Sequence, residues 1–109
     1  MAAGPSGPVS PPGGHGEGGE TVILAIAGEI DMETVGHLTA VLYDAIATPG
    51  VAEIVADFSG VTFCDAVGIQ GLYDAYAQAR SGGIRLRLSN LQRPVRRVLE
   101  ITGMLDTLT

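Results

Sequence analysis

The sequence predicts a single α/β domain, and three features of the chain lead to that expectation. Short apolar runs at residues 21–27, 53–58 and 84–88 are rich in β-forming residues and indicate strands. Apolar residues recur at helical spacing after each run. The chain has 109 residues, of which 46% are hydrophobic, enough for one core without disulfides. Because strands alternate with helices, we expect parallel strands joined by crossover helices.

The first 19 residues differ in composition from the rest of the chain. They consist mainly of Gly, Pro, Ser and Ala, with almost no side chain large enough to anchor them. The entropy lost on ordering such a segment would not be offset by apolar burial. We therefore expect a disordered Gly/Pro-rich tail over residues 1–19 and a folded domain over residues 20–109.

The first crossover begins with the apolar run at residues 21–27. Apolar and polar residues do not alternate in this run, which is typical of a strand buried on both faces. A turn at residues 28–31 follows, and Pro49 ends the next helix. That helix is predicted from one apolar stripe, made of Val35, Leu38, Val41, Leu42, Ala45 and Ile46.

In the middle of the chain the spacing of apolar residues changes from that of a strand to that of a helix. We expect the functional surface there. Residues 53–58 indicate a buried strand, and residues 59–65 have the composition of a tight loop. Asp65 is placed to cap the helix that follows. The apolar stripe of that helix is Ile69, Leu72, Tyr73 and Tyr76.

The last third predicts one more strand and helix. Apolar residues alternate with Arg85 and Arg87 over residues 84–88, which indicates one buried face near a sheet edge. Pro94 suits a first helical turn, and Gly103 is placed to end that helix.

Charge and composition exclude several function classes. The formal net charge is −6, and all six basic residues are arginines between Arg80 and Arg97. An acidic body disfavours nonspecific nucleic-acid binding, which depends on neutralising phosphates. No apolar run reaches the roughly 18 residues of a membrane span. The single cysteine and the lack of a visible signal peptide lead us to expect a cytoplasmic protein.

No motif indicates catalysis, a cofactor or a metal. Residues 59–68 lack both the GK[ST] ending of a phosphate-binding loop and the GxGxxG pattern. Cys64 would need a base, and His37 is the only histidine outside the tail, with nothing in the sequence to place it nearby. A buried cysteine acting as a small hydrophobic residue is the simpler interpretation. Alternating acids at residues 29, 31 and 33 could suggest a hard metal ion, but capping explains them better.

Four segments, in this order, resemble the STAS domain, the sulfate transporter and anti-sigma factor antagonist family. They are AGEIDMETV (27–35), IVADFSGVTFCDAVGIQGL (54–72), GGIRLRLSN (82–90) and VRRVLEITGM (95–104). The resemblance implies a STAS-like sandwich, a mostly parallel or mixed sheet of about four strands with helices packed on it. The length is similar to that of free-standing bacterial antagonists.

Family members usually carry a strand before residue 21, for which the tail is a poor candidate. Its loss would expose an edge to a partner or, in a homodimer, a second copy.

The resemblance also implies a function. In such antagonists the residues before the central helix are typically Asp-Ser-Ser-Gly, and the first serine is the phosphorylation site. An anti-sigma factor that is also a serine kinase-like ATPase binds this surface, and its sequestration releases the sigma factor for transcription. The corresponding residues here are Asp65, Ala66, Val67 and Gly68. The phosphoacceptor position, Ala66, therefore has no oxygen to phosphorylate.

Three hypotheses follow from this alanine. The protein is an antagonist that is never switched off, it uses another hydroxyl such as Ser59 or Thr62, or it serves another complex. The last would be a STAS accessory subunit or ligand-sensing module, for instance with a transport ATPase. The resemblance places the partner surface at Asp31, Thr62, Asp65, Ala66, Val67, Gly68 and Ile69.

Overall fold

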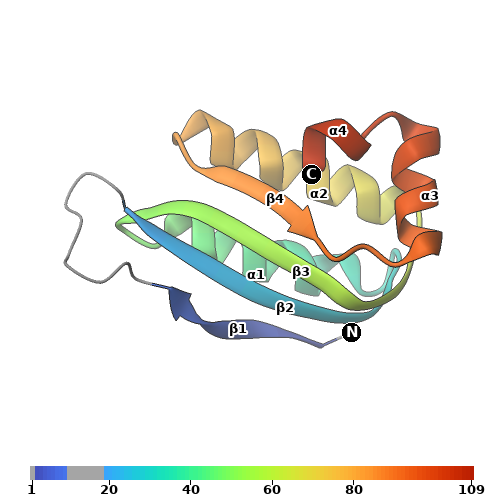
Figure 1. Cartoon of the computed structure of the whole chain (residues 1–109), viewed down its shortest axis with the longest axis horizontal. Coiled ribbons are helices and arrows are strands. Elements are labelled where there is room, and N and C mark those ends of the chain that lie inside the picture. Colours follow the sequence, from blue (N-terminus) through green and yellow to red (C-terminus); the bar gives the residue numbers. More distant parts are fainter. Residues whose placement is uncertain (1, 10–18) are drawn as a thin grey trace.

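The computed structural model describes residues 2–9 and 19–109, which form one mixed four-stranded sheet with helices packed on it (Figure 1). The α/β fold expected from the sequence is confirmed. No helix in the described ranges is long and apolar enough to cross a membrane. The elements in chain order are β1 (Ala2–Val9), β2 (Glu20–Ile30), α1 (Val35–Ala47), β3 (Val51–Cys64), α2 (Ala66–Ser81), β4 (Arg85–Ser89), α3 (Arg93–Thr102) and α4 (Leu105–Leu108).

The sheet is parallel in its centre and has one antiparallel edge. The strand order is β1-β2-β3-β4, in which β2 pairs with β3 and β3 with β4 in parallel. Helices α1 and α2 connect these parallel strands, and both lie behind the sheet in Figure 1. The front face of β2 and β3 carries no helix. Leu24 and Ile26 are accordingly buried while Ala25 is exposed, so β2 is not buried on both faces as predicted.

The core lies between the sheet and the helices. Phe58 is the largest fully buried side chain. Full burial of such a side chain stabilises the fold by about 1.5–3 kcal/mol. Gly103 adopts a left-handed conformation (φ 77°) at the end of α3, as its position in the sequence predicted. The other core residues from the central strands and helices include Leu24, Ile26, Ile54, Leu86, Leu38, Leu42, Leu72, Ala75, Val95 and Leu99.

Strand β3 is longer than the sequence predicted. It continues through residues 59–64, where we expected a loop, and runs as far as Cys64. Its pairing with β2 shifts at three places, so β3 accommodates extra residues as bulges. A Cβ at Gly60 would lie 2.9 Å from the Cβ of Ala27, so glycine allows the two strands to approach closely there. The turn-like residues Ser59 and Gly60 therefore serve an irregular strand.

The segment predicted as a disordered tail contributes a strand. Residues 2–9 form β1, which pairs antiparallel with β2 from Ala2 opposite Ala27 to Val9 opposite Thr21. An edge strand pairs on one side only and therefore tolerates the missing N–H groups of its prolines. The edge of β2 that we expected to be exposed is thus covered. The rest of the predicted tail, residues 1 and 10–18, lies outside the described residues.

Two glycine variants test the packing of the helices. We expect Gly68→Ala to lower the free energy of unfolding by about 1–3 kcal/mol, the usual range for overpacking. Its Cβ would lie 2.7 Å from both Cys64 Sγ and Ile30 Cγ2. A Cβ added at Gly36 in α1 would have nothing within 4 Å, so Gly36→Ala should raise stability by about 0.5–1 kcal/mol. Urea unfolding measures both, and equal effects of the same sign would contradict the close approach at Gly68.

Candidate functional site

The carboxyl ends of β2 and β3 lie side by side at one end of the molecule. Because the two strands are parallel, the turns that follow them emerge at the same edge of the sheet. The backbone N–H of Asp65 donates a hydrogen bond of 3.1 Å to the carbonyl of Ile30, which joins the start of α2 to the end of β2. The structure thus brings the Asp31 turn close to the start of α2.

Asp31 holds the turn that leads into α1. Its Oδ1 accepts hydrogen bonds from the backbone N–H groups of Glu33 (2.9 Å) and Thr34 (3.0 Å). The Thr34 hydroxyl accepts from the Asp31 N–H at 2.9 Å and donates to the Glu29 carbonyl at 2.8 Å. The Asp31 carboxylate therefore holds the turn before α1 and does not cap the helix itself, whose N-cap residue is Thr34.

Asp65 caps α2 and sets which residues of its first turn reach solvent. Its Oδ1 accepts a hydrogen bond of 3.0 Å from the backbone N–H of Gly68. Ala66 and Val67 are exposed, whereas Gly68 and Ile69 are buried. Of the predicted partner surface here, Ala66 and Val67 are the exposed side chains, and Asp65 is half-buried.

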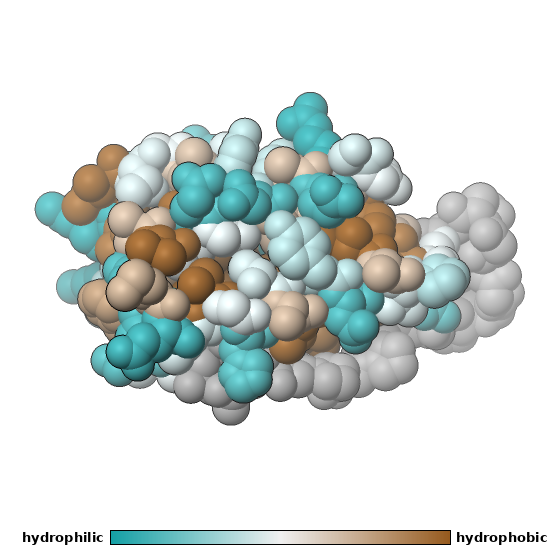
Figure 2. Space-filling model, turned by 180° about the vertical axis from the view of Figure 1, so that it is seen from behind, coloured by the Kyte–Doolittle hydropathy of each residue, from teal (hydrophilic) through white to brown (hydrophobic). Residues whose placement is uncertain are grey.

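Large apolar side chains are exposed around this end, and all of them except Val67 lie outside the predicted partner surface. Met32 follows Asp31, and Phe63 precedes Cys64 on β3. Ile101 belongs to α3, which stands at the same end in Figure 1. Figure 2, seen from behind, shows brown groups between teal ones at this end, on its left. The exposed fractions are 75% for Met32, 45% for Phe63, 44% for Val67 and 73% for Ile101. The one feature of the sequence that could have indicated an exposed Met32 is its position between two acids, Asp31 and Glu33.

A groove of about 450 Å³ runs between α1 and α2 from the start of α2. Its surface is mostly apolar. Gly71 allows the two helices to approach, since a Cβ there would lie 2.8 Å from Val35 Cγ2. The groove is lined by Val35, Thr39, Ala66, Val67, Gln70, Gly71 and Asp74.

Cys64 is a packing residue. It is 1% exposed, and burial, with a smaller contribution from the charge of Asp65, raises the pKa of its thiol to about 12. The candidate base His37 is exposed on α1. Over residues 2–9 and 19–109 no group of three His, Cys, Asp or Glu side chains could hold a metal ion. The described residues thus assemble no nucleophile or metal site around Cys64.

Ser59, one of the two alternative phosphoacceptors, belongs to a network on β3. Its N–H donates to Asp57 Oδ1 at 2.9 Å, and its carbonyl accepts from Gln92 Nε2 at 2.6 Å. Asn90 Nδ2 also donates to Asp57 Oδ1, at 3.2 Å. The hydrogen bond from the Ser59 backbone, and then that from Asn90, lower the pKa of the Asp57 carboxyl. A phosphate on Ser59 would therefore face a carboxylate held in its charged form.

Both alternative hydroxyls lie on strand β3, before the cap of α2. Ser59 lies five positions before Cys64 on β3, a length on the order of 15 Å along the strand. Thr62 is exposed and closer, but it too precedes the cap at Asp65. Neither hydroxyl occupies the position of Ala66 on α2.

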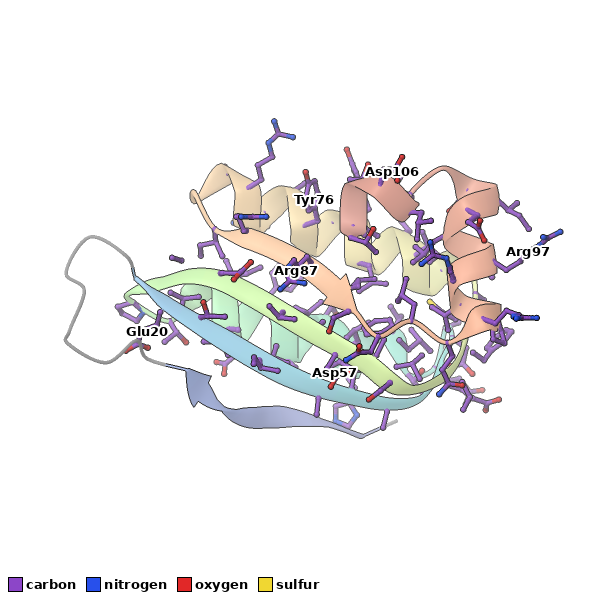
Figure 3. All side chains as sticks on the ribbon, in the orientation of Figure 1. Glu20, Asp57, Tyr76, Arg87, Arg97 and Asp106 are labelled. Carbon is purple, nitrogen blue, oxygen red and sulfur yellow. The ribbon has the colours of Figure 1, made fainter. Side chains whose placement is uncertain are left out.

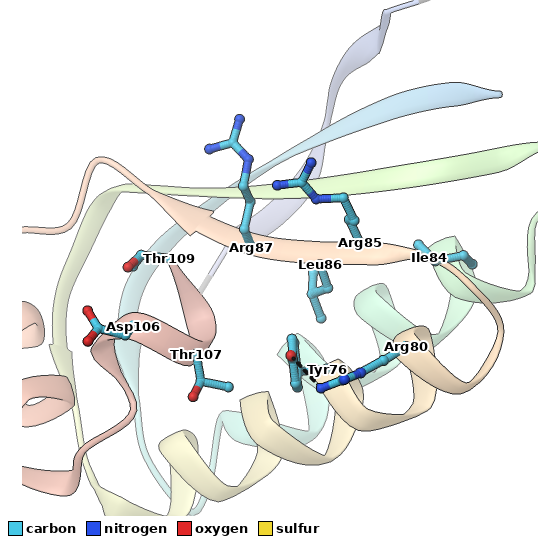
Figure 4. Close-up of a pocket in the computed structure, with 9 residues that line it drawn as sticks. All are labelled: Tyr76, Arg80, Ile84, Arg85, Leu86, Arg87, Asp106, Thr107 and Thr109. Atoms are coloured by element: carbon cyan, nitrogen blue, oxygen red, sulfur yellow. Dashed lines mark hydrogen bonds between the residues drawn. The ribbon is translucent and has the colours of Figure 1, made fainter. Parts of the chain in front are cut away.

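A second pocket, of about 350 Å³, lies between α2, β4 and α4 (Figure 4). Tyr76 and Arg80 enter it from α2, and Arg80 Nη1 donates to Tyr76 Oη at 3.4 Å. The guanidinium groups of Arg85 and Arg87 project from β4 to the other side. There Arg87 Nε pairs with Glu53 Oε2 at 3.2 Å. Figure 3 shows Arg87 and Asp57 on this helix-free side. This pocket is separate from the end where β2 and β3 finish.

Among known protein families, the STAS domain matches residues 16–109 of this sequence. The chain belongs to the STAS domain family. No curated protein matches it in sequence.

Solved structures with this STAS fold include regulators and a transporter-family protein. SpoIIAA, an anti-sigma factor antagonist in its unphosphorylated form, is 26% identical, with a TM-score of 0.68 over 79% of this chain and 75% of that chain. An anti-sigma factor antagonist from Mycobacterium paratuberculosis is 21% identical, with a TM-score of 0.74 over 98% of this chain and 83% of that chain. A sulfate transporter family protein from Wolinella succinogenes is 22% identical, with a TM-score of 0.68 over 82% and 71%. The last two likenesses concern the fold alone.

The accessibility of Cys64 gives one prediction for this STAS domain. Because the thiol is buried and its pKa is raised to about 12, we expect an aromatic disulfide reagent at pH 8 to label it only after unfolding. Labelling followed by absorbance, with and without urea, measures this. Immediate labelling of the native protein would show that Cys64 is not held between β3 and α2.

The lowered pKa of Asp57 gives a pH-dependent prediction. A carboxyl whose pKa is lower in the folded than in the unfolded chain stabilises folding above its unfolded value, 3.8. This contribution is lost as the pH falls through the folded value. We expect the stability advantage of wild type over Asp57→Asn to be constant above about pH 5 and to shrink below it. Urea unfolding across pH measures the difference, with Asp44→Asn as the control for losing one acid. An advantage that persists at low pH would contradict the assignment.

Proposed function

We propose that this STAS domain is an anti-sigma factor antagonist-like binding module that sequesters an anti-sigma factor kinase and is not switched off by phosphorylation. The similarity to SpoIIAA supports the class of partner. The observation that carries the rest is Ala66, which is exposed at the first position of α2, directly after the Asp65 cap. An alanine at this position has no oxygen for a kinase to modify.

The proposed partner surface combines the Asp31 turn, Thr62 on β3 and the first turn of α2. Asp31 shapes it through the turn that it holds and Asp65 through its cap of α2, and Ala66 and Val67 supply small apolar contacts. Gly68 and Ile69 belong to it as buried support, because the missing Cβ of Gly68 lets α2 pack against Cys64 and Ile30. A phosphate on this turn would bring about −1.5 to −2 charges beside Asp65. With Ala66 in place the surface keeps one charge state.

The described side chains support binding and not catalysis. The Cys64 thiol is buried and its pKa is raised, which disfavours the reactive thiolate. The carboxylates of Asp31 and Asp65 accept hydrogen bonds from nearby backbone N–H groups and so hold turns. The proposed activity is therefore regulation of transcription through a protein contact in the cytoplasm, with no cofactor and no metal.

Ala66 also fits a second function, that of a STAS accessory subunit or ligand-sensing module in another assembly such as a transport ATPase. Such a subunit would have no need of a phosphoacceptor at the start of α2. The partner class separates the two proposals, because the first requires a kinase-like ATPase and the second does not.

Substitutions at Ala66 test the proposed function. We expect wild type to bind an anti-sigma factor kinase of its source with ATP present, and Ala66→Asp to weaken binding at least tenfold. The added carboxylate would lie beside Asp65 and lose its hydration in the interface. Only Ala66→Ser should take up phosphate from labelled ATP. Calorimetry and phosphate incorporation measure the two effects.

Ala77→Asp is the matched control, because Ala77 is exposed on the same helix but outside the proposed surface. We expect it to bind like wild type. Wild-type protein that binds a transport ATPase and none of a panel of anti-sigma factor kinases would overturn the first proposal in favour of the second. Phosphate incorporated into wild type at Ser59 or Thr62 would restore the switch and contradict a permanently active form.

A further inference from the structure

We propose that the groove between α1 and α2 receives a basic amphipathic helix of the partner. This inference rests on the proposed function and names the element of the partner that the site recognises. Three observations carry it: the apolar lining of the groove, the distribution of charge around it, and its continuity with the start of α2.

The lining of the groove suits apolar side chains presented by a helix. Val35, Val67 and Ala66 give it an apolar surface, and the groove is open to solvent along its length. Gly71 adds no side chain to the groove at the point where Val35 Cγ2 and Thr39 Cγ2 approach. Amphipathic helices bind by laying their apolar face into such grooves between helices.

The one charged side chain in the lining of the groove is acidic. Asp74 lines it, and Gln70 Nε2 donates to Asp74 Oδ1 at 2.9 Å, which holds the carboxylate at the rim. Asp31 and Glu33 precede α1, and Asp65 precedes α2. No lysine or arginine occurs before Arg80 in the sequence. An apolar groove whose one charged lining residue is acidic favours a helix flanked by Lys or Arg and attracts it electrostatically.

The groove is continuous with the proposed partner surface. Ala66 and Val67 line it and are also the exposed residues of the first turn of α2. A helix seated in the groove would therefore cover position 66. Substitutions further along the groove, at Gln70 and Asp74, should then affect the same partner as substitutions at Ala66.

The first experiment uses a synthetic 18-residue amphipathic helix of Leu, Ala and Lys as the probe, with a version carrying Glu in place of Lys as its control. We expect the Lys peptide to shift backbone amide NMR signals of Val67, Gly71 and Asp74, and the Glu peptide to leave them unchanged. Shifts confined to other surfaces, or equal effects of both peptides, would overturn the inference.

The second experiment uses matched variants of the full chain. Asp74→Lys should weaken binding of the Lys peptide at least tenfold, and Asp44→Lys, on the exposed side of α1, less than threefold. Gln70→Trp should block the groove, while Gln78→Trp, two turns later on α2 and exposed, should not. Equal effects within either pair would show that binding depends only on net charge or on side-chain size. That result would overturn the proposal that the helix binds in the groove.

The same variants, tested with an anti-sigma factor kinase, separate the two proposals. Kinase binding that is weakened by Ala66→Asp, Asp74→Lys and Gln70→Trp supports both. Kinase binding that is weakened by Ala66→Asp alone supports the proposed function and overturns the groove as the seat of the partner. Peptide binding in the groove without binding of any kinase overturns the proposed function and leaves the groove as a site for another basic helix.

Discussion

The parallel pairing of β2 with β3 is the constraint on which the candidate site depends. It brings two strand ends to one edge, and the hydrogen bond from the Asp65 N–H to the Ile30 carbonyl extends that pairing to the first residue beyond β3. The close packing of α2 then requires Gly68, because any Cβ there would meet Ile30 and Cys64. The exposed position of Ala66 follows from these contacts.

The carboxylates of Asp31 and Asp65 hold backbone in place at this end, and apolar side chains stand beside them at the surface. Asp31 and Asp65 each satisfy N–H groups that a helix or turn leaves unpaired. Catalysis would instead need a carboxylate or thiol aimed at a reacting atom. Met32 and Val67 remain available to a partner, and exposed apolar side chains grouped near one another mark interaction surfaces. Rigid turns carrying apolar contacts suit protein recognition.

The fold was largely predictable because local patterns and tertiary packing agree in most of the chain. The helical stripes, apart from Tyr73, which is exposed on α2, follow from local chemistry, as do the cap at Asp65 and the left-handed end at Gly103. The continuation of β3 did not, since the composition around Ser59 and Gly60 is equally suitable for a turn and a bulge, and the pairing of β2 decides between them. Strand β1 escaped prediction for a related reason. Its pairing partner, and not its own composition, makes it a strand.

Ala66 changes how the proposed antagonist can be regulated. A switch requires two forms of the protein whose affinities for the partner differ, and a hundredfold difference corresponds to about 2.7 kcal/mol of binding free energy. Phosphorylation at the start of α2 would create such forms, but alanine leaves a single one. Occupancy of the partner then depends on the concentrations of the two proteins and on their dissociation constant. Such an antagonist would bind the kinase in proportion to its own concentration. The amount of free kinase would then be controlled by synthesis and degradation of the antagonist.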